Sequence, residues 1–355
     1  MTRSPLERAQ ALADGLLRPS AEQVDRTRVP RSSLDAWAGE GLLGLAGPRS
    51  HGGAQAPAAV VREVTEVLAG ACGATWFVAA QHATPLAELT ASDNDDLRAQ
   101  HLAGLCSGEV LAGVAFSHLR RPGPPAVRAT RAQGGWRFDG HVAWTTGWGL
   151  VDLLLLAGQS GDDEVVLVLV EAAEGAGLTA SAPLALAAMQ ATATVTLDLD
   201  DLHVPDAAVV RVAPGPQWRA ADALRTANPA PHVFGLQREC VRRLAETASR
   251  RDDGTAAALA HALGQEGERL RRVAWALVDD VPPEDLVEDR LAVRASSLEL
   301  ALRSATALVA ATGGSALSLD AAPQRLAREA VFYLVQAQTA PVREAVLQLW
   351  RDTGA

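Results

Sequence analysis

The pattern of hydrophobic and polar positions changes twice along the chain and so predicts three parts. Up to about residue 107, apolar residues recur at helical spacing, most clearly in residues 56–68 and 86–105. From about residue 109 to residue 212 the spacing falls to two, as in residues 136–139 and 192–199. Short apolar runs at residues 151–157 and 165–170 have the length of buried strands. This part is predicted to be a β domain.

Helical spacing returns from residue 217 onward. One stripe follows spacings of four and three and consists of Leu291, Ala295, Leu298, Leu302, Ala305 and Val309. The predicted fold class is therefore α+β. A helical N-terminal domain spans residues 1–107, a central antiparallel β domain with one solvated face spans 108–215, and a C-terminal helical bundle spans 216–355.

Composition narrows the classes of function. With 48% hydrophobic and 21% charged residues, the chain is an ordinary folded protein, and no apolar run is long enough for a membrane span. Residues 1–10 lack an apolar signal core, and three widely spaced cysteines predict a reducing cytoplasm without disulfides or a metal site. A net charge of -10 argues against a nucleic-acid partner.

The segment from residue 305 to 339 carries the most specific pattern. A long helix is predicted to stop at Gly313-Gly314, and Arg328-Glu329 belongs to the opening of the next helix. This resembles the acyl-CoA dehydrogenase family, in which Gly-Gly precedes an Arg-Asp pair and a glutamate base follows nine residues after that arginine. The ninth residue after Arg328 is Ala337, within the sequence Gln-Ala-Gln-Thr where the family reads Tyr-Glu-Gly-Thr. The alternative position for this glutamate in some branches lies near Leu224 and is not acidic either. The catalytic base is therefore unknown.

The resemblance extends over nearly the whole chain. Residues 41–53, with Gly-Gly at their end, resemble the family's N-terminal entry, and residues 200–205 resemble the acidic strand end of its β domain. Residues 135–146 resemble the strand pair that leads to its Trp-x-Thr flavin segment. The resemblance implies the acyl-CoA dehydrogenase fold with a C-terminal four-helix bundle, FAD as cofactor and an acyl thioester as substrate.

Trp144 and Thr146 are the residues that the resemblance places against the flavin. An isoalloxazine ring needs an apolar or aromatic contact surface and hydrogen bonds at its edges. Side chains at positions i and i+2 of a strand lie on the same face of the sheet, so Trp144 and Thr146 could serve one ring together. The alternative is an ordinary strand that happens to carry a Trp and a Thr. Phe116 and Ser117 occupy the place of the family's strand that lines the flavin. The Arg120-Arg121 pair after them either faces a diphosphate or lies in a solvated turn.

Four further positions match cofactor-binding positions of the family less completely. Arg251 falls near its pyrophosphate motif but is followed by two acids instead of a phenylalanine. Gly313 and Gly314 match glycines that meet the flavin adenylate from the partner subunit, although a plain helix end explains them equally well. Thr339 matches the threonine that follows the family's glutamate.

Two alternatives to an atypical acyl-CoA dehydrogenase remain open. Flavin-dependent monooxygenases of the same fold lack the glutamate, receive reduced flavin (FMN in this reading) from a reductase and place histidines near it. His82 matches their N-terminal histidine, with a structural histidine as the other interpretation, and their C-terminal histidine falls near Gln336. The second alternative is a catalytically silent homologue that binds a ligand.

The sequence therefore predicts a cytoplasmic flavin-dependent oxidoreductase acting on an acyl thioester or another small molecule. The family resemblance also implies a homodimer or homotetramer and an electron-transfer or reductase partner. Neither a metal, a membrane nor a nucleic acid is expected.

Overall fold

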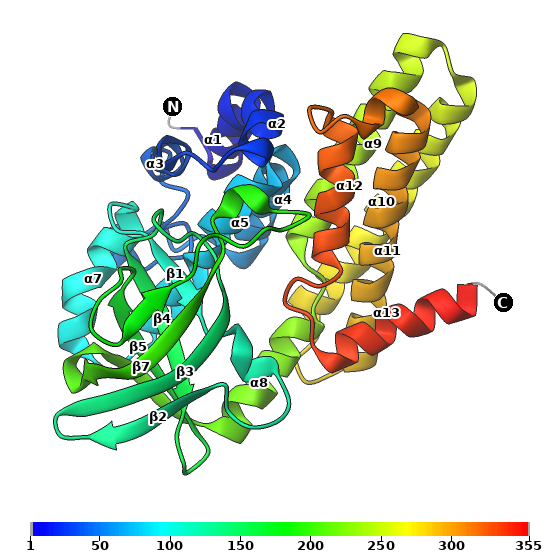
Figure 1. Cartoon of the computed structure of the whole chain (residues 1–355). Coiled ribbons are helices and arrows are strands. Elements are labelled where there is room, and N and C mark those ends of the chain that lie inside the picture. The colour runs from blue at the N-terminus through cyan, green and yellow to red at the C-terminus, as the bar shows by residue number, and fades with distance from the viewer. Residues whose placement is uncertain (1–2, 354–355) are drawn as a thin grey trace.

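The computed structural model describes residues 3–353 and contains the predicted order of helices, sheet and helices (Figure 1). No helix within residues 3–353 has both the length and the apolar character needed to cross a membrane. The N-terminal helices are α1 (Pro5–Leu12), the π-helical turn η1 (Ala13–Leu17), α2 (Arg18–Arg26), α3 (Arg31–Gly39), the 3₁₀ turn η2 (Arg49–His51), α4 (Ala58–Ala71), α5 (Gly73–Gln81), α6 (Ala83–Thr90) and α7 (Asp95–Ser107).

Local sequence explains where these helices begin and end. A capping box starts α1, because the Glu7 amide donates to the Ser4 hydroxyl at 3.2 Å and the Ser4 amide donates to the Glu7 carboxylate at 2.7 Å. The Asn94 side chain caps α7 by accepting a hydrogen bond from the Leu97 amide. That helix ends at Gly108, whose φ of 76° favours glycine, and a Cβ there would lie 2.6 Å from the Cβ of Ala38.

One eight-stranded sheet forms the middle of the molecule. Its strands run in the order β6-β7-β3-β2-β4-β5-β8, and β1 pairs with β4 beside this path. The strands are β1 (Ala112–Ala115), β2 (Val127–Ala132), β3 (Gly135–Thr145), β4 (Leu153–Gln159), β5 (Glu164–Glu171), β6 (Leu178–Ala180), β7 (Val195–Pro205) and β8 (Val209–Pro214), with the 3₁₀ turns η3 (Ser117–Arg120), η4 (Gln190–Thr192) and η5 (Asp206–Ala208) between them.

The sheet is mixed, so the prediction of a wholly antiparallel domain is wrong in this detail. β1 runs parallel to β4 in a register that pairs Ala112 with Leu153, and β2 meets β4 in parallel at Arg128 and Gln159. The other strand pairs are antiparallel. The period-2 pattern misled because it reports which face of a strand is buried, whereas the direction of the neighbouring strand is set by the long connections.

Strand β4 is buried on both faces. Leu154 and Leu156 belong to the main hydrophobic core, while Leu153 and Leu155 belong to a second core with residues of α6 and α7. A strand of this kind reads as a continuous apolar run, as residues 151–157 do. Strands β4 and β5 are therefore buried on both faces, whereas buried and exposed residues alternate along β2, β3 and β7, which have one solvated face as predicted.

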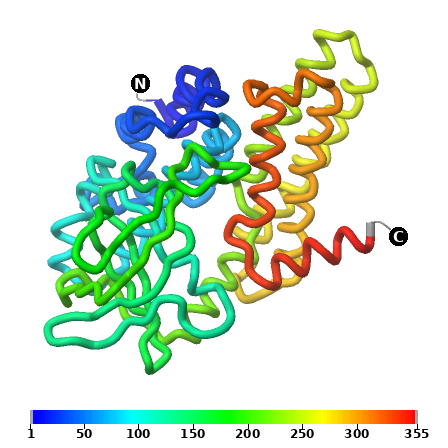
Figure 2. The backbone as a smooth tube through the Cα atoms, in the orientation of Figure 1, coloured from blue at the N-terminus to red at the C-terminus, as the bar shows by residue number. Residues whose placement is uncertain are grey.

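The C-terminal helices stand beside the sheet, and four of them, α9 to α12, form the predicted bundle (Figure 1). The tube in Figure 2 shows the loop of residues 181–194 reaching from the sheet toward α12, where the Ala187 carbonyl accepts from Arg328 at 3.5 Å. The helices are α8 (Gly215–Ala227), α9 (Pro231–Arg251), α10 (Gly254–Asp280), α11 (Val287–Thr312), the 3₁₀ turn η6 (Gly314–Leu317), α12 (Ala322–Tyr333) and α13 (Ala340–Thr353).

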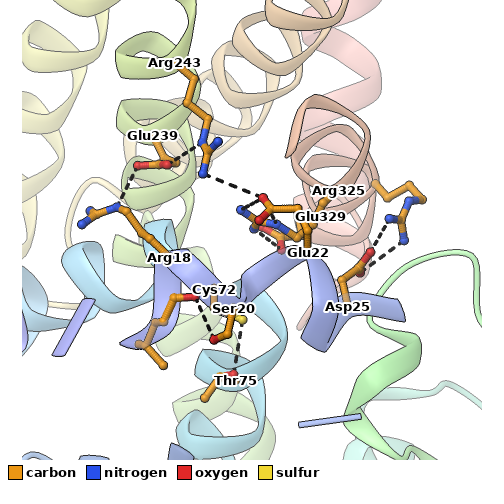
Figure 3. Close-up of polar contacts among 12 residues, drawn as sticks. Arg18, Ser20, Glu22, Asp25, Cys72, Thr75, Glu239, Arg243, Arg325 and Glu329 are labelled. Carbon is orange, nitrogen blue, oxygen red and sulfur yellow. Dashed lines mark hydrogen bonds and ion pairs between the residues drawn. The ribbon is translucent and has the colours of Figure 1, made fainter. Parts of the chain in front are cut away.

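A buried ion pair links the bundle to the N-terminal helices. Arg325 on α12 is fully buried and donates to the Glu329 carboxylate at 2.7 Å and to Glu22 of α2 at 3.3 Å. Figure 3 shows the Arg325 and Glu329 side chains facing Glu22, with Arg243 of α9 reaching toward the same carboxylate. Burial raises the pKa of Glu329, and Arg325 opposes that shift.

Further ion pairs surround this one. Arg328 on α12 pairs with Asp25 of α2, and Arg18 pairs with Glu239 of α9 at 3.2 Å. Arg243 donates to the same Glu239 at 2.7 Å. Helices α2, α9 and α12 are thus held together by alternating charges (Figure 3).

The buried pair predicts a large stability loss in Glu329→Gln. This variant leaves the Arg325 guanidinium buried without its main counter-charge, which typically costs about 3–5 kcal/mol. The free energy of unfolding, measured by urea denaturation, should fall by that amount. Asp201→Asn is the control, since Asp201 and its partner Arg137 are both exposed and the change should have little effect. A Glu329→Gln variant as stable as the control would contradict this account of the interface.

Candidate active site

A cavity of about 900 Å³ lies where the N-terminal helices, the sheet and the C-terminal bundle meet. Helix α5, strands β1 and β3, the loop of residues 186–189, the start of α9 and the end of α12 all contribute to its lining. Seven residues singled out in the sequence line it together, namely Phe116, Ser117, Arg120, Trp144, Thr146, Gln336 and Ala337. Its size is in the usual range for small-molecule sites.

Trp144 and Thr146 meet the cavity from the end of β3. The Trp144 side chain is a large apolar group left 45% exposed. Thr146 is the first residue after the strand, and its hydroxyl lies 3.0 Å from that of Thr194, which lies 2.9 Å from the Thr192 hydroxyl. The strand end therefore presents an aromatic surface beside an ordered row of hydroxyl groups.

This donor set fits the ring end of a flavin. Trp144 and Phe116 offer aromatic surface, and the hydroxyls of Ser117 and Thr146 offer hydrogen bonds at its margin. These residue types match what an isoalloxazine ring requires, so the cavity is suited to the cofactor that the resemblance implies.

The other predicted cofactor residues lie elsewhere in the chain. Arg251 donates to the carbonyls of Ala311 at 2.6 Å and Thr312 at 2.8 Å, next to Gly313 at the end of α11. Gly313 and Gly314 are separated from Ala337 by the length of α12, about 18 Å at 1.5 Å per residue. Neither these residues nor Thr339 is among the residues that line the cavity, within the part of the chain that the structure describes.

Both ring nitrogens of His82 form hydrogen bonds with backbone groups. Its Nδ1 accepts from the Ala112 amide at 3.0 Å, and its Nε2 donates to the Leu105 carbonyl at 2.9 Å. Burial lowers the pKa of this imidazole, and the side chain lies outside the cavity. His82 joins α7 to β1, so the geometry supports the structural interpretation over the catalytic one.

Ala337 lies in the turn after α12, at the predicted place beside the cavity. Its φ is 48°, and its carbonyl accepts from Nη2 of Arg294 at 3.4 Å. Among the described residues that line the cavity, none is an aspartate or a glutamate. The methyl group of Ala337 cannot remove a proton, and no carboxylate of the lining replaces it.

Three arginines line the cavity in place of a carboxylate. Arg120 forms a two-point contact with Asp222 at 2.8 and 2.9 Å, and Arg225 donates to the same carboxylate at 2.5 Å. Arg294 on α11 is the third. Arg120 is therefore not in a solvated turn, since its side chain is largely buried and lines the cavity, whereas its contact with a diphosphate stays a prediction. The Asp-x-x-Arg spacing of Asp222 and Arg225 on a helix was the available signal.

His232 is the remaining titratable residue of the lining. Its ring stacks on Trp76 with centroids 4.4 Å apart and meets Tyr333 edge-on at 4.6 Å. Burial, together with the nearby Arg294 charge, lowers the pKa of His232 to about 3. The ring is therefore neutral near pH 7. A single histidine after Pro231 gave no sequence signal for this environment.

Comparisons with known proteins point to the family named in the sequence analysis. Residues 3–109 match the family described as the acyl-CoA dehydrogenase N-terminal domain. The benzylmalonyl-CoA dehydrogenase of Aromatoleum aromaticum is 24% identical over 205 residues, which cover 55% of this chain and 53% of that protein. The match thus spans only about half the length of that relative.

Solved structures match over nearly the whole chain. Butyryl-CoA dehydrogenase from Megasphaera elsdenii superposes with a TM-score of 0.83 at 15% identity, covering 98% of both chains. Dibenzothiophene monooxygenase from Paenibacillus sp. A11-2 superposes with a TM-score of 0.81 at 18% identity, covering 98% of this chain and 97% of the other. These findings confirm the resemblance to the acyl-CoA dehydrogenase family: residues 3–109 carry its N-terminal domain, and the chain as a whole has its fold.

Proposed function

We propose that this protein is a flavin-dependent oxidoreductase that acts on an acyl thioester without the family's glutamate base. The observation that carries the proposal is the shared cavity. It brings Phe116, Ser117, Trp144 and Thr146 together with the turn that contains Ala337.

The chain's own residues have distinct roles in this proposal. Trp144 and Phe116 would hold the flavin ring through their aromatic surfaces, and the hydroxyls of Ser117 and Thr146 would form hydrogen bonds with it. FAD, when bound, supplies the two-electron redox chemistry. The aromatic pair Phe77 and Phe332, with ring centroids 4.8 Å apart, lines the cavity between α5 and α12 and adds apolar surface to it.

The cavity offers no good base for removing a proton from a carbon atom of the substrate. Ala337 has no basic group, and the neutral imidazole of His232 is a poor base because its pKa is lowered to about 3. The same buried environment keeps His232 able to accept a hydrogen bond from a bound substrate.

A second candidate is a flavin-dependent monooxygenase of the same fold. The absence of a carboxylate from the described lining favours it, since such an enzyme does not need the glutamate. The two candidates differ in the electron partner, an electron acceptor for the dehydrogenase and a flavin reductase for the monooxygenase.

A homodimer or homotetramer belongs to the proposal. Arg251, Gly313 and Gly314 gather at the end of the bundle far from the cavity, so they can serve a cofactor only in a second copy of the chain. Sedimentation velocity on the flavin-loaded protein measures this, and a clean monomer at micromolar concentration would contradict it.

Replacement of Trp144 tests the placement of the flavin. Trp144→Ala removes most of the aromatic surface at the end of β3, so the flavin content per chain should fall about tenfold or the flavin absorption bands should shift. His141→Ala on the same strand is the control, because His141 is exposed and pairs with Asp198 outside the cavity. Flavin content and spectrum that stay unchanged in Trp144→Ala would refute the placement.

Replacement of Ala337 tests the missing base. The native protein should show negligible turnover of simple saturated acyl-CoA substrates, because loss of a general base costs about 10²–10⁴ in rate. Ala337→Glu should raise dye-coupled oxidation of a chain-length series of acyl-CoAs at least tenfold.

Ala337→Gln is the matched control for this change. The glutamine side chain has nearly the size of glutamate and meets the same strain at the positive φ of position 337. Its amide, however, cannot accept the proton. Equal activity of the two variants, or robust activity of the native protein with ordinary acyl-CoAs, would show that the base lies elsewhere.

A further inference from the structure

We infer that the substrate of this cavity carries a carboxylate in its acyl portion, and that Arg120, Arg225 and Arg294, here called the arginine cluster, recognise it. The inference rests on the proposed function and specifies its substrate class. It follows from the charge of the cavity lining and from the position of that charge.

Arg294 contributes a buried charge without a carboxylate partner in the described structure. The residue is 5% exposed and donates to backbone carbonyls of Thr226, Gln336 and Ala337. Its Nε has no hydrogen-bond partner among the described residues. Hydrogen bonds to these neutral carbonyls orient the Arg294 guanidinium but do not neutralise its positive charge.

Arg120 and Arg225 share a single carboxylate. Both donate to Asp222, which is 5% exposed, and they lower its pKa although burial alone would raise it. Asp222 therefore stays ionised. Three guanidinium charges against one carboxylate leave an excess of two positive charges at this part of the cavity.

The charges of Arg120 and Asp222 also act on Arg294. Burial lowers the pKa of Arg294 to about 10, repulsion from Arg120 adds to this shift, and attraction by Asp222 opposes it. The overall net charge of -10 does not explain a positive cavity, so the excess is a local feature. Buried charge of one sign is costly unless an opposite charge accompanies it, so a bound anion would relieve this cost.

The position of the arginine cluster indicates which part of a ligand carries the anion. Arg294 contacts the Ala337 turn, the place where the family's base meets the reacting carbon of the substrate. Arg120 follows Ser117, and α8, which carries Arg225, lies between the sheet and the bundle (Figure 1). The anion therefore lies near the reacting acyl group, and a carboxylate matches the two-pronged geometry of a guanidinium.

The test compares two six-carbon thioesters that differ only in charge. Adipyl and hexanoyl thioesters of N-acetylcysteamine lack the phosphates of CoA, so a difference in their affinity reports the acyl carboxylate alone. Calorimetry on the flavin-loaded protein should show that the adipyl thioester binds at least tenfold more tightly. Hexanoyl-CoA in a parallel titration measures the contribution of the CoA phosphates.

Arg225→Gln is the main variant, because its side chain is half-exposed and its removal leaves the Arg120–Asp222 contact in place. The ratio of the two dissociation constants should fall about tenfold in Arg225→Gln. Arg120→Gln is a second variant with the same expectation. Arg128→Gln, an exposed arginine on β2 outside the cavity, is the control and should keep the native ratio.

The outcomes separate the inference from the proposed function. Equal affinity of the native protein for both short thioesters would overturn the inference alone, as would a ratio in Arg225→Gln equal to that in Arg128→Gln. If Arg225→Gln weakens only hexanoyl-CoA, the arginine cluster binds the CoA phosphates and the inference is wrong. If the flavin-loaded protein binds no thioester at all, the proposed function fails together with it.

Discussion

The buried contact of Arg325 with Glu329 and Glu22 is the constraint on which the rest of the structure depends. Removing two charges from water is so costly that the pair persists only while α2, α9 and α12 stay closely packed around it. The same packing places Tyr333, one turn beyond Glu329, edge-on against Trp76 of α5 with centroids 5.8 Å apart. It thereby fixes where α12 ends, and so where the Ala337 turn meets the sheet. The ion pair lies outside the cavity, yet it sets the position of the cavity's wall.

The charge of the cavity lining near Ala337 distinguishes this chain from the acyl-CoA dehydrogenase pattern described in the sequence analysis. A glutamate at position 337 would place a negative charge beside the Arg294 guanidinium, whereas Ala337 leaves the guanidinium facing only backbone carbonyls. The described lining of the cavity therefore carries arginines and no carboxylate. The positive charge of these arginines favours anionic groups, and burial together with the Arg294 charge lowers the pKa of His232. In the function proposed above, the anionic substrate and the missing base have one cause, the presence of Ala337 in place of a glutamate.

The sequence predicted the architecture and several residues that line the cavity, for physical reasons that differ between residues. Helix, sheet and helix follow from the period of the apolar positions, because each period reports one buried face. The parallel pairing of β1 with β4 could not be predicted in this way, because the direction of a neighbouring strand does not change the period of the apolar positions. Phe116, Ser117, Trp144, Thr146 and Ala337 were found because their motifs keep a fixed order along the chain.

The residues that sequence reasoning missed depend on tertiary burial. Arg294 lies beside the apolar stripe of α11, and a charged residue on a helix usually lies in solvent. His232 becomes part of an aromatic cluster only when α5, α9 and α12 meet. His82 was proposed from its motif position, yet both of its nitrogens bind backbone groups, which no local pattern reveals.

The central claim is that this cavity holds a flavin, and the flavin content of the native protein tests it most directly. The purified protein is unfolded, and the released cofactor is quantified and identified by chromatography. The account predicts a yellow protein that contains about one FAD per chain, or takes up FAD to that level, because Trp144 and the neighbouring hydroxyls fit its ring. A colourless protein that takes up neither FAD nor FMN would contradict the account and would favour a catalytically silent, ligand-binding homologue.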